Sequence, residues 1–353
     1  LYAVVAGNVG KSGIWRSTDD GVTWTDISPS GWVKNKSRLV LDIASSNENI
    51  VYILSEPFGL WKYTYQSGDG SGSGGQWDDR SANRPVLGGD MEEWGTQGNY
   101  DLYVRVKPDD ENTVFLANTN LYRSTDGFST TNNIKVIGGY KGVPCCTMYP
   151  NHHPDNNAAV FVPGKPNVMY SGHDGGVSKT LDVSANEVAW IYSNGYLTTQ
   201  FYHVSIDHSG KNQDLIVGGM QDNSSYKTES TNNNEAWVHL LGGDGMYSAV
   251  GDSGNAIAAS WQNGGTKLIE PTWRTLIPLG STGAQWSNPI VINPADNKML
   301  YYVGGTTLWR IADMVTTGNS VYSNGSWYND GYEQMTQTEK GFTIGNLGLS
   351  TEN

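Results

Sequence analysis

One short motif recurs along this chain and constrains its fold more than any other feature. An aliphatic, an aromatic and a basic residue follow one another in four copies, at Gly13–Thr18, Gly59–Thr64, Asn120–Thr125 and Thr307–Arg310. Each copy follows an apolar run, and a period of roughly 40–60 residues built from short strands is the signature of a β-propeller. The repeat therefore predicts blades arranged in a ring. Propellers bind ligands on one face of the disc, around the central channel.

The composition suits a single turn-rich β domain. Of 353 residues, 44 are Gly, 13 are Trp and 20 are Tyr, and no long stretch has helical periodicity. Repeat architectures run long as one domain, so we expect residues 1–353 to form one propeller. The chain begins at Leu1 without Met or a basic leader, so we expect a mature product or a piece of a longer protein.

Charge and targeting signals exclude some classes of function. A net charge of −13 with only 22 Lys and Arg argues against binding to nucleic acid. No run of 18 apolar residues is present, which predicts no membrane span. Sequons at Asn35, Asn223 and Asn324 favour a secreted or cell-surface protein.

The two cysteines are adjacent, at Cys145 and Cys146, so no disulfide can join distant parts of the chain. A vicinal disulfide and two buried thiols both remain open. We favour the thiols because pairing of adjacent cysteines strains the disulfide geometry.

Short alternating segments predict the strands of each blade. The expected innermost strands are Arg38–Ser46, Tyr100–Pro108, Asn157–Gly164, Phe201–His208, Gly245–Gly251, Asn288–Pro294 and Phe342–Ser350. The expected second strands are Leu1–Ala6, Asn49–Ser55, Asn112–Ala117, Asn167–Gly172, Asp214–Gly219, Asn255–Ser260 and Lys298–Val303. The first of the expected second strands, Leu1–Ala6, has no inner strand before it in the sequence. The last expected inner strand, Phe342–Ser350, has no second strand after it. We therefore expect Phe342–Asn353 to complete the N-terminal blade and to close a ring of seven four-stranded antiparallel blades.

A polar turn follows the first copy of the motif. Its pattern is Ser-x-Asp-x-Gly-x-Thr-Trp, with Ser17, Asp19, Gly21 and Trp24. Ser and Asp side chains bond the hairpin backbone, Gly adopts positive φ, and we expect the Trp to pack across neighbouring strands. A degraded copy contains Ser124 and Asp126. These residues are expected to be structural rather than catalytic.

The repeated turn resembles the Asp-box (BNR) propellers, a superfamily of sialidases, sortilin-type receptors and xyloglucan hydrolases. The chain is most similar to secreted bacterial sortilin-like propellers, also described as glycosyl-hydrolase-type. The matching segments are Gln97–Leu102, His153–Asn157, Gly172–Gly176, Gln200–Tyr202, Gly218–Asn223 and Gly242–Met246. The resemblance implies the propeller fold. It implies no activity by itself, because unrelated functions share folds.

Strand order places the loops between second and third strands, and those between blades, on one face. The residues expected to bind a ligand there are Trp94, Tyr100, Asp101, His153, Asp155, His173, Asp174, Asp222 and Asp244. Clustered carboxylates favour a cation or a network of sugar hydroxyls. Ca²⁺ is the candidate ion, and Asp155, Asp174 and Asp222 are its candidate ligands. The alternative, which we favour, is that each Asp caps its own Gly-rich turn.

A zinc site at His152 and His153 needs a third ligand, for which the nearest candidates are His173 and His203. It is less favoured, because Asn157 stands where the similar propellers often have a histidine.

The residues of this face lead to three candidate functions. We favour an extracellular module or scaffold that binds glycan or protein. The second is a glycoside hydrolase, with catalytic candidates Asp155, Asp174, Glu92 and Glu93. The third is a structural unit of a surface assembly. Sialidase activity is disfavoured because the face offers few arginines for a substrate carboxylate.

Overall fold

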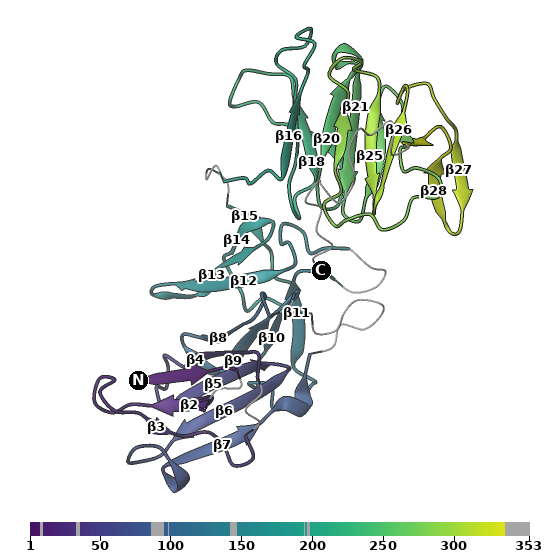
Figure 1. The fold of residues 1–353 in the computed structure, drawn as a ribbon. Helices are drawn as coiled ribbons and strands as arrows, with labels where there is room; N and C mark the ends of the chain where they lie inside the picture. Colours follow the sequence, from purple (N-terminus) through teal and green to yellow (C-terminus); the bar gives the residue numbers. More distant parts are fainter. Residues whose placement is uncertain are drawn as a thin grey trace. The chain divides into compact units, whose positions relative to one another are not determined.

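The computed structural model describes residues 1–7, 10–32, 36–85, 95–97, 99–141, 147–193, 195 and 198–335. Contacts divide the chain into two compact units, residues 1–196 and 197–353. Each unit is a series of antiparallel sheets (Figure 1). Helical structure in the described part is limited to the 3₁₀ turns Gly72–Gly74, Ser81–Asn83 and Asp252–Gly254.

Four sheets make up the described part of the first unit. The first has three strands, β1 (Tyr2–Val5), β2 (Gly13–Arg16) and β3 (Thr25–Asp26). The second contains β4 (Arg38–Ile43), β5 (Ile50–Glu56), β6 (Gly59–Tyr65) and β7 (Gly75–Asp79). The third contains β8 (Tyr103–Lys107), β9 (Asp110–Ala117), β10 (Leu121–Ser124) and β11 (Ile134–Gly138). The fourth contains β12 (Asn156–Val162), β13 (Lys165–His173), β14 (Gly176–Thr180) and β15 (Ile191–Tyr192).

Three four-stranded sheets and one hairpin make up the described part of the second unit. The first contains β16 (His203–Ile206), β17 (Ile216–Gly219), β18 (Ser225–Thr228) and β19 (Val238–Leu241). The second contains β20 (Ser248–Gly251), β21 (Ala256–Trp261), β22 (Gly265–Glu270) and β23 (Arg274–Thr275). The third contains β24 (Ile290–Ile292), β25 (Leu300–Gly304), β26 (Thr307–Ile311) and β29 (Glu333–Gln334).

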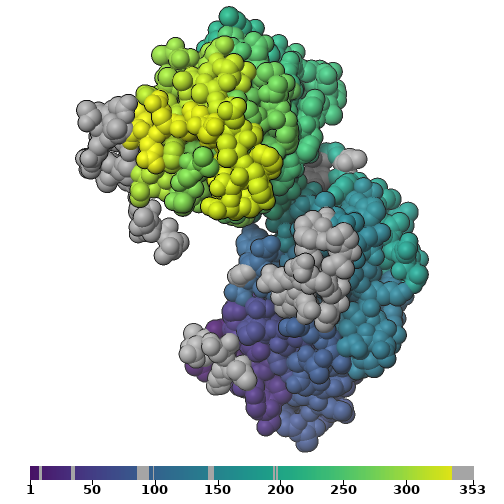
Figure 2. All heavy atoms as spheres, turned by 90° about the vertical axis from the view of Figure 1, so that its right-hand side faces the viewer, coloured from purple at the N-terminus to yellow at the C-terminus, as the bar shows by residue number. Residues whose placement is uncertain are grey.

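The hairpin of β27 (Ser320–Ser323) and β28 (Ser326–Asn329) is inserted in sequence between β26 and β29. Its residues lie at the surface of the second unit, where Figure 2 shows them in yellow. Tyr322 and Trp327 are paired across the two strands and are 61% and 55% exposed.

The strand predictions agree with the described sheets. The motif copies form β2, β6, β10 and β26, and every expected second strand overlaps an observed one. The expected inner strands correspond to β4, β8, β12, β16, β20 and β24. Phe342–Ser350, Cys145 and Cys146 lie outside the described residues, so ring closure, seven blades and the state of the cysteines stay predictions.

The apolar sequence of β5 explains how neighbouring sheets stack. Ile50, Tyr52 and Leu54 pack in one cluster with residues of β8 and β9, and Val51 and Ile53 pack in another with Ile14 of β2. Side chains alternate between the two faces of a strand, so a strand covered on both faces is apolar throughout. The sheet of β4–β7 is therefore held between the sheet of β1–β3 and that of β8–β11, as a propeller blade is.

The turn from β2 to β3 is organised by its own polar side chains. Ser17 Oγ donates to Asp19 Oδ1 at 2.8 Å and accepts from the Gly21 amide at 2.8 Å. The Asp19 carboxylate accepts from Thr23 Oγ1 and from the Thr23 amide, at 2.6 and 2.8 Å. Trp24 donates from Nε1 to the Gly21 carbonyl of the same turn at 3.0 Å and is 39% exposed, so its packing across neighbouring strands stays a prediction.

These hydrogen bonds favour the ionised form of Asp19. The Thr23 hydroxyl, then the Thr23 amide and Ser17, lower the pKa of Asp19 to about 2. The same pattern recurs after β10, where Ser124 Oγ donates to Asp126 Oδ1 at 2.7 Å and accepts from the Phe128 amide at 2.8 Å. The structural role expected for both turns is consistent with these contacts.

Replacing Ser124 with alanine is expected to destabilise the first unit by about 1–3 kcal/mol, because the buried Phe128 amide loses its acceptor. Urea unfolding measures the change. Thr125→Ala is the control, because Thr125 is exposed in the same turn. An equal effect of the two substitutions would contradict the role given to the Ser124 hydroxyl.

Candidate functional site

Three carboxylates of the first unit come from neighbouring strand ends. Asp101 precedes β8, Asp155 precedes β12, and Asp174 lies in the turn between β13 and β14. The Asp174 amide donates to the Asp155 carbonyl at 3.1 Å, and the Asp155 amide donates to the Thr119 carbonyl at 2.9 Å. We call Asp101, Asp155 and Asp174 the carboxylate cluster.

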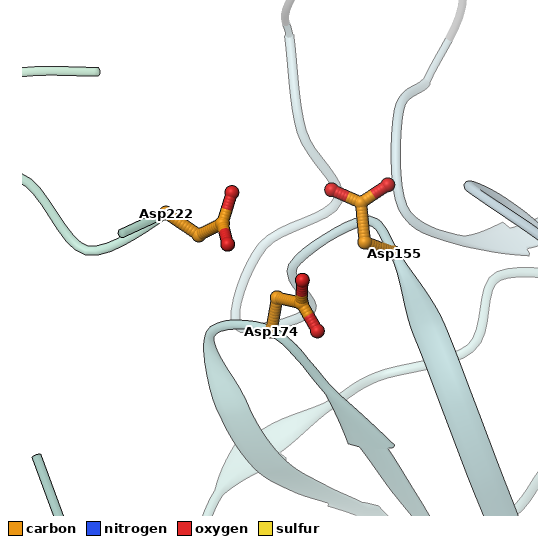
Figure 3. Close-up of side chains that lie close together, drawn as sticks. All are labelled: Asp155, Asp174 and Asp222. Carbon is orange, nitrogen blue, oxygen red and sulfur yellow. The ribbon is translucent and has the colours of Figure 1, made fainter. Parts of the chain in front are cut away.

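Asp155 and Asp174 lie side by side (Figure 3), and their nearest carboxylate oxygens are within 4.8 Å of each other. Gln97 Nε2 donates to Asp155 Oδ1 at 3.2 Å, and Asn157 Nδ2 donates to Asp174 Oδ1 at 2.7 Å. Burial raises the pKa of Asp155, the Gln97 hydrogen bond lowers it, and the charge of Asp174 raises it further. Asp155 and Asp174 therefore place their carboxylates, and the Gln97 and Asn157 amides bonded to them, together at these strand ends.

Asp101 is the most unusual member of the cluster. Its side chain is fully buried, and among the described residues no donor bonds either carboxylate oxygen. Desolvation, followed by the charges of Asp155 and Asp174, raises the pKa of Asp101 to about 7. The positive charge of Arg38 opposes this shift. Asp101 therefore holds a proton much more readily than an ordinary aspartate.

Two buried histidines pack beside these strand ends. The rings of His152 and His173 lie 4.7 Å apart, and His152 Nε2 lies 3.1 Å from Ser171 Oγ. His173 Nε2 lies 2.8 Å from Ser178 Oγ. Burial lowers the pKa of His173 to about 4 and lowers that of His152 as well. Both rings are therefore neutral at neutral pH.

The zinc alternative gains no support from this geometry. Among the residues that the structure describes, no histidine belongs to a group of three potential ligands whose atoms lie within 4.8 Å of one another. His153 Nδ1 lies 3.1 Å from the Pro154 carbonyl, and its ring lies 6.2 Å from that of His173. The histidines pack mainly against one another and against Trp190.

Tyr100, which directly precedes Asp101 in the chain, has an exposed aromatic side chain. It is 70% exposed, although Asp101, its neighbour in sequence, is fully buried. The guanidinium of Arg38 donates to the carbonyl oxygens of Asn99 and Tyr100 and so holds this segment. Trp94, Glu92 and Glu93 lie outside the described residues.

The two acidic candidates of the second unit contact each other. Asp244 Oδ1 accepts from the Asp222 amide at 2.9 Å, and the Asp244 amide donates to Gln262 Oε1 at 3.0 Å. Asp244 is 8% exposed, and these contacts are those of a turn-capping side chain. A ligand shared by Asp222 with Asp155 and Asp174 stays a prediction.

Sequence reasoning placed Asp101, Asp155 and Asp174 at one face. The structure brings Asp155 and Asp174 close together, and their charges act on Asp101. Sequence reasoning did not assign roles to Gln97, Asn157 or Arg38. Gln97 and Asn157 lie within Gln97–Leu102 and His153–Asn157, two of the segments that resemble Asp-box propellers. That resemblance was the signal that could have pointed to them. No signal in the sequence pointed to Arg38, because Arg38 and its partner Asn99 are 61 residues apart.

Comparisons with known proteins bear on the fold. The chain superposes on a GH74 xyloglucanase from Xanthomonas campestris with a TM-score of 0.56 and 15% identity over 89% of this chain. The fold is that of a β-propeller. The chain spans 48% of the xyloglucanase, about half its length. At this identity the likeness to that propeller shows the fold alone.

Two further alignments superpose less well, so we infer nothing from them. A GH74 enzyme from Niastella koreensis aligns with 15% identity and a TM-score of 0.34, over 94% of this chain and 52% of that one. YCF48 bound to a D1 peptide aligns with 11% identity and a TM-score of 0.31, over 86% of this chain and 84% of that one. No protein-family model matches the sequence, and no curated protein matches it.

The described residues contain no helix long and apolar enough to cross a membrane.

Proposed function

We propose that this propeller is an extracellular module that binds a glycan at the strand ends of the first unit. The observation that carries the proposal is the exposed side chain of Tyr100, which directly precedes Asp101, at the edge where β8, β12 and the β13–β14 turn meet. Loops at strand ends of a rigid scaffold are where propellers place binding groups.

The chemistry of these groups suits a polyhydroxylated ligand. An exposed aromatic ring offers an apolar face for a sugar ring, while its polar neighbours bond hydroxyls. Asp155 and Asp174 provide acceptors, and the Gln97 and Asn157 amides, which now bond these carboxylates, provide donors. A protein ligand is the alternative, since the same groups bond a peptide.

Membership of the Asp-box superfamily and export from the cell are parts of the same proposal. The hydrogen bonds of Ser17 with Asp19, repeated by Ser124 with Asp126, support the first. The sequons at Asn223 and Asn324 support the second. In the described part, Asn324 lies in the tight turn of the β27–β28 hairpin with a φ of 49°.

A glycoside hydrolase is the second candidate, and one observation favours it. Such enzymes pair a carboxyl of raised pKa, which acts as an acid, with an ionised carboxylate nearby. Burial raises the pKa of Asp155, and a carboxylate oxygen of Asp174 lies within 4.8 Å of it. Release of soluble sugar from a bound polysaccharide separates this candidate from a binding module.

Replacing Tyr100 with alanine is expected to weaken glycan binding at least ~10-fold, as loss of an aromatic contact does at binding sites. A glycan array with the unmodified chain identifies the ligand, and calorimetry then measures its affinity for both proteins. Tyr322→Ala is the matched control, because Tyr322 is exposed on the second unit's hairpin.

Binding without sugar release supports the module, and release supports the hydrolase. Binding that survives Tyr100→Ala, or an array without any bound glycan, would overturn the proposed site.

A further inference from the structure

We propose that Asn324, in the loop of the β27–β28 hairpin, is a site of spontaneous deamidation in the folded protein. Asn324 is followed by Gly325, and together they form the whole loop between the two strands. The proposal concerns the second unit alone and is independent of glycan binding.

The reaction needs only the asparagine, the next amide group and water. The Gly325 amide nitrogen attacks Cγ of the Asn324 side chain, so a new C–N bond forms while the bond from Cγ to Nδ2 breaks. The proton of the attacking amide leaves with the side-chain nitrogen as ammonia. Water then opens the resulting succinimide ring at one of its two carbonyls and gives aspartate or isoaspartate. Glycine favours the attack because no Cβ atom shields its nitrogen.

The turn conformation holds the two reacting atoms apart. Asn324 and Gly325 have φ of 49° and 79°, and Ser323 pairs with Ser326 across the loop. Positive φ at both central residues is typical of the type I′ turn, which Asn-Gly prefers. Ring closure needs Asn324 Cβ and the Gly325 nitrogen to be eclipsed about the Cα–C bond, and a left-handed backbone does not allow this. The rate therefore depends on how readily the turn opens.

Few contacts oppose the opening of this hairpin. Within the described part of the chain, β27 and β28 form a sheet of their own, and a bridge between Pro278 and Asn329 joins its base to the rest of the unit. A two-stranded hairpin by itself is marginally stable in water. Asn324, Gly325 and Ser326 are exposed, and no atom lies within 4 Å of a Cβ position at Gly325. The tip can therefore open without disturbing the core.

A second Asn-Gly pair in the same unit provides an internal comparison, because its turn is packed. Asn263 and Gly264, between β21 and β22, have φ of 61° and 77°. The Asn263 amide donates to the Trp286 carbonyl, and the Tyr302 hydroxyl donates to the Gly264 carbonyl, both at 2.9 Å. A Cβ atom at Gly264 would lie 2.4 Å from Cβ of Ala284. Tertiary contacts therefore hold the same dipeptide in its turn.

Peptide mapping by mass spectrometry tests the proposal, on chain made without glycosylation and kept folded in mildly alkaline buffer. We expect Asn324 to exchange its NH₂ group for OH at least ~10-fold faster than Asn263, since each 1.4 kcal/mol of extra opening cost at Asn263 slows its reaction about tenfold. In urea, where the contacts of Asn263 are lost, the two rates are expected to be similar. An intact Asn324 after an incubation that converts the unfolded chain, or equal rates in the folded chain, would overturn the proposal.

The product is expected to loosen the hairpin. Isoaspartate inserts an extra carbon into the main chain, whereas a two-residue loop fixes the register of β27 with β28. We expect hydrogen exchange of the β27 and β28 amides to become at least ~10-fold faster in aged protein. Asn324→Gln is the matched control, because its longer side chain closes a ring much more slowly. If exchange rises equally in aged Asn324→Gln, the change does not come from Asn324 and the proposal is wrong.

Discussion

Replacing Gly245 with alanine is expected to destabilise the second unit by about 3 kcal/mol or more, the upper end of overpacking effects. A Cβ atom at Gly245 would lie 2.0 Å from the Ser224 carbonyl oxygen and 2.6 Å from the Met220 nitrogen. Both are backbone atoms, so no side chain can move aside. The Met220 amide donates to the same Ser224 oxygen, and the Gly245 amide donates to the Met220 carbonyl.

Urea unfolding, followed by tryptophan fluorescence, measures this loss. Gly242→Ala is the matched control, because no atom lies within 4 Å of the Cβ position at Gly242. The control is expected to unfold like the unmodified chain. Equal stability of Gly245→Ala and Gly242→Ala would show that the backbone of this loop adapts.

Replacing Asp101 with asparagine is expected to stabilise the first unit at pH 8 and to have little effect at pH 4. The pKa of Asp101 is raised from 3.8 to about 7 by burial and by Asp155 and Asp174, against the opposing charge of Arg38. Between these values the folded protein binds more protons than the unfolded chain. Stability of the unmodified protein therefore falls as pH rises through this window, and the loss is complete above pH 7.

The size of this effect follows from the shift. Each pKa unit corresponds to about 1.4 kcal/mol, so the free energy of unfolding of the variant is expected to exceed that of the unmodified protein by up to about 4 kcal/mol at pH 8. Buried His173, whose lowered pKa acts in the opposite direction, is common to both proteins and cancels in the difference. Urea unfolding at pH 4, 6 and 8 measures the gain.

Glu48→Gln is the control for this pH series, since it removes the same charge from a side chain that is exposed and not buried. A stability difference between Asp101→Asn and the unmodified protein that is equal at all three pH values would contradict the raised pKa.

The strands and turns could be predicted because their signals are local. The alternation of side chains and the aliphatic-aromatic-basic motif each span only a few residues. The copies of the motif coincide with the observed β2, β6, β10 and β26. Ser17 and Asp19, which are hydrogen-bonded to each other, are two residues apart in sequence, so the turn pattern also predicted their hydrogen bond.

The sequence by itself determined the all-β class, the four-strand repeat and the set of acidic residues near the strand ends. Only the tertiary structure decided that Asp101 is buried without a donor, that Asp155 and Asp174 lie close together, and that Asp244 caps the Asp222 amide. Desolvation and charge repulsion depend on what surrounds a group in space. The groups that surround Asp101 come from segments between residues 38 and 174, so no local pattern records them.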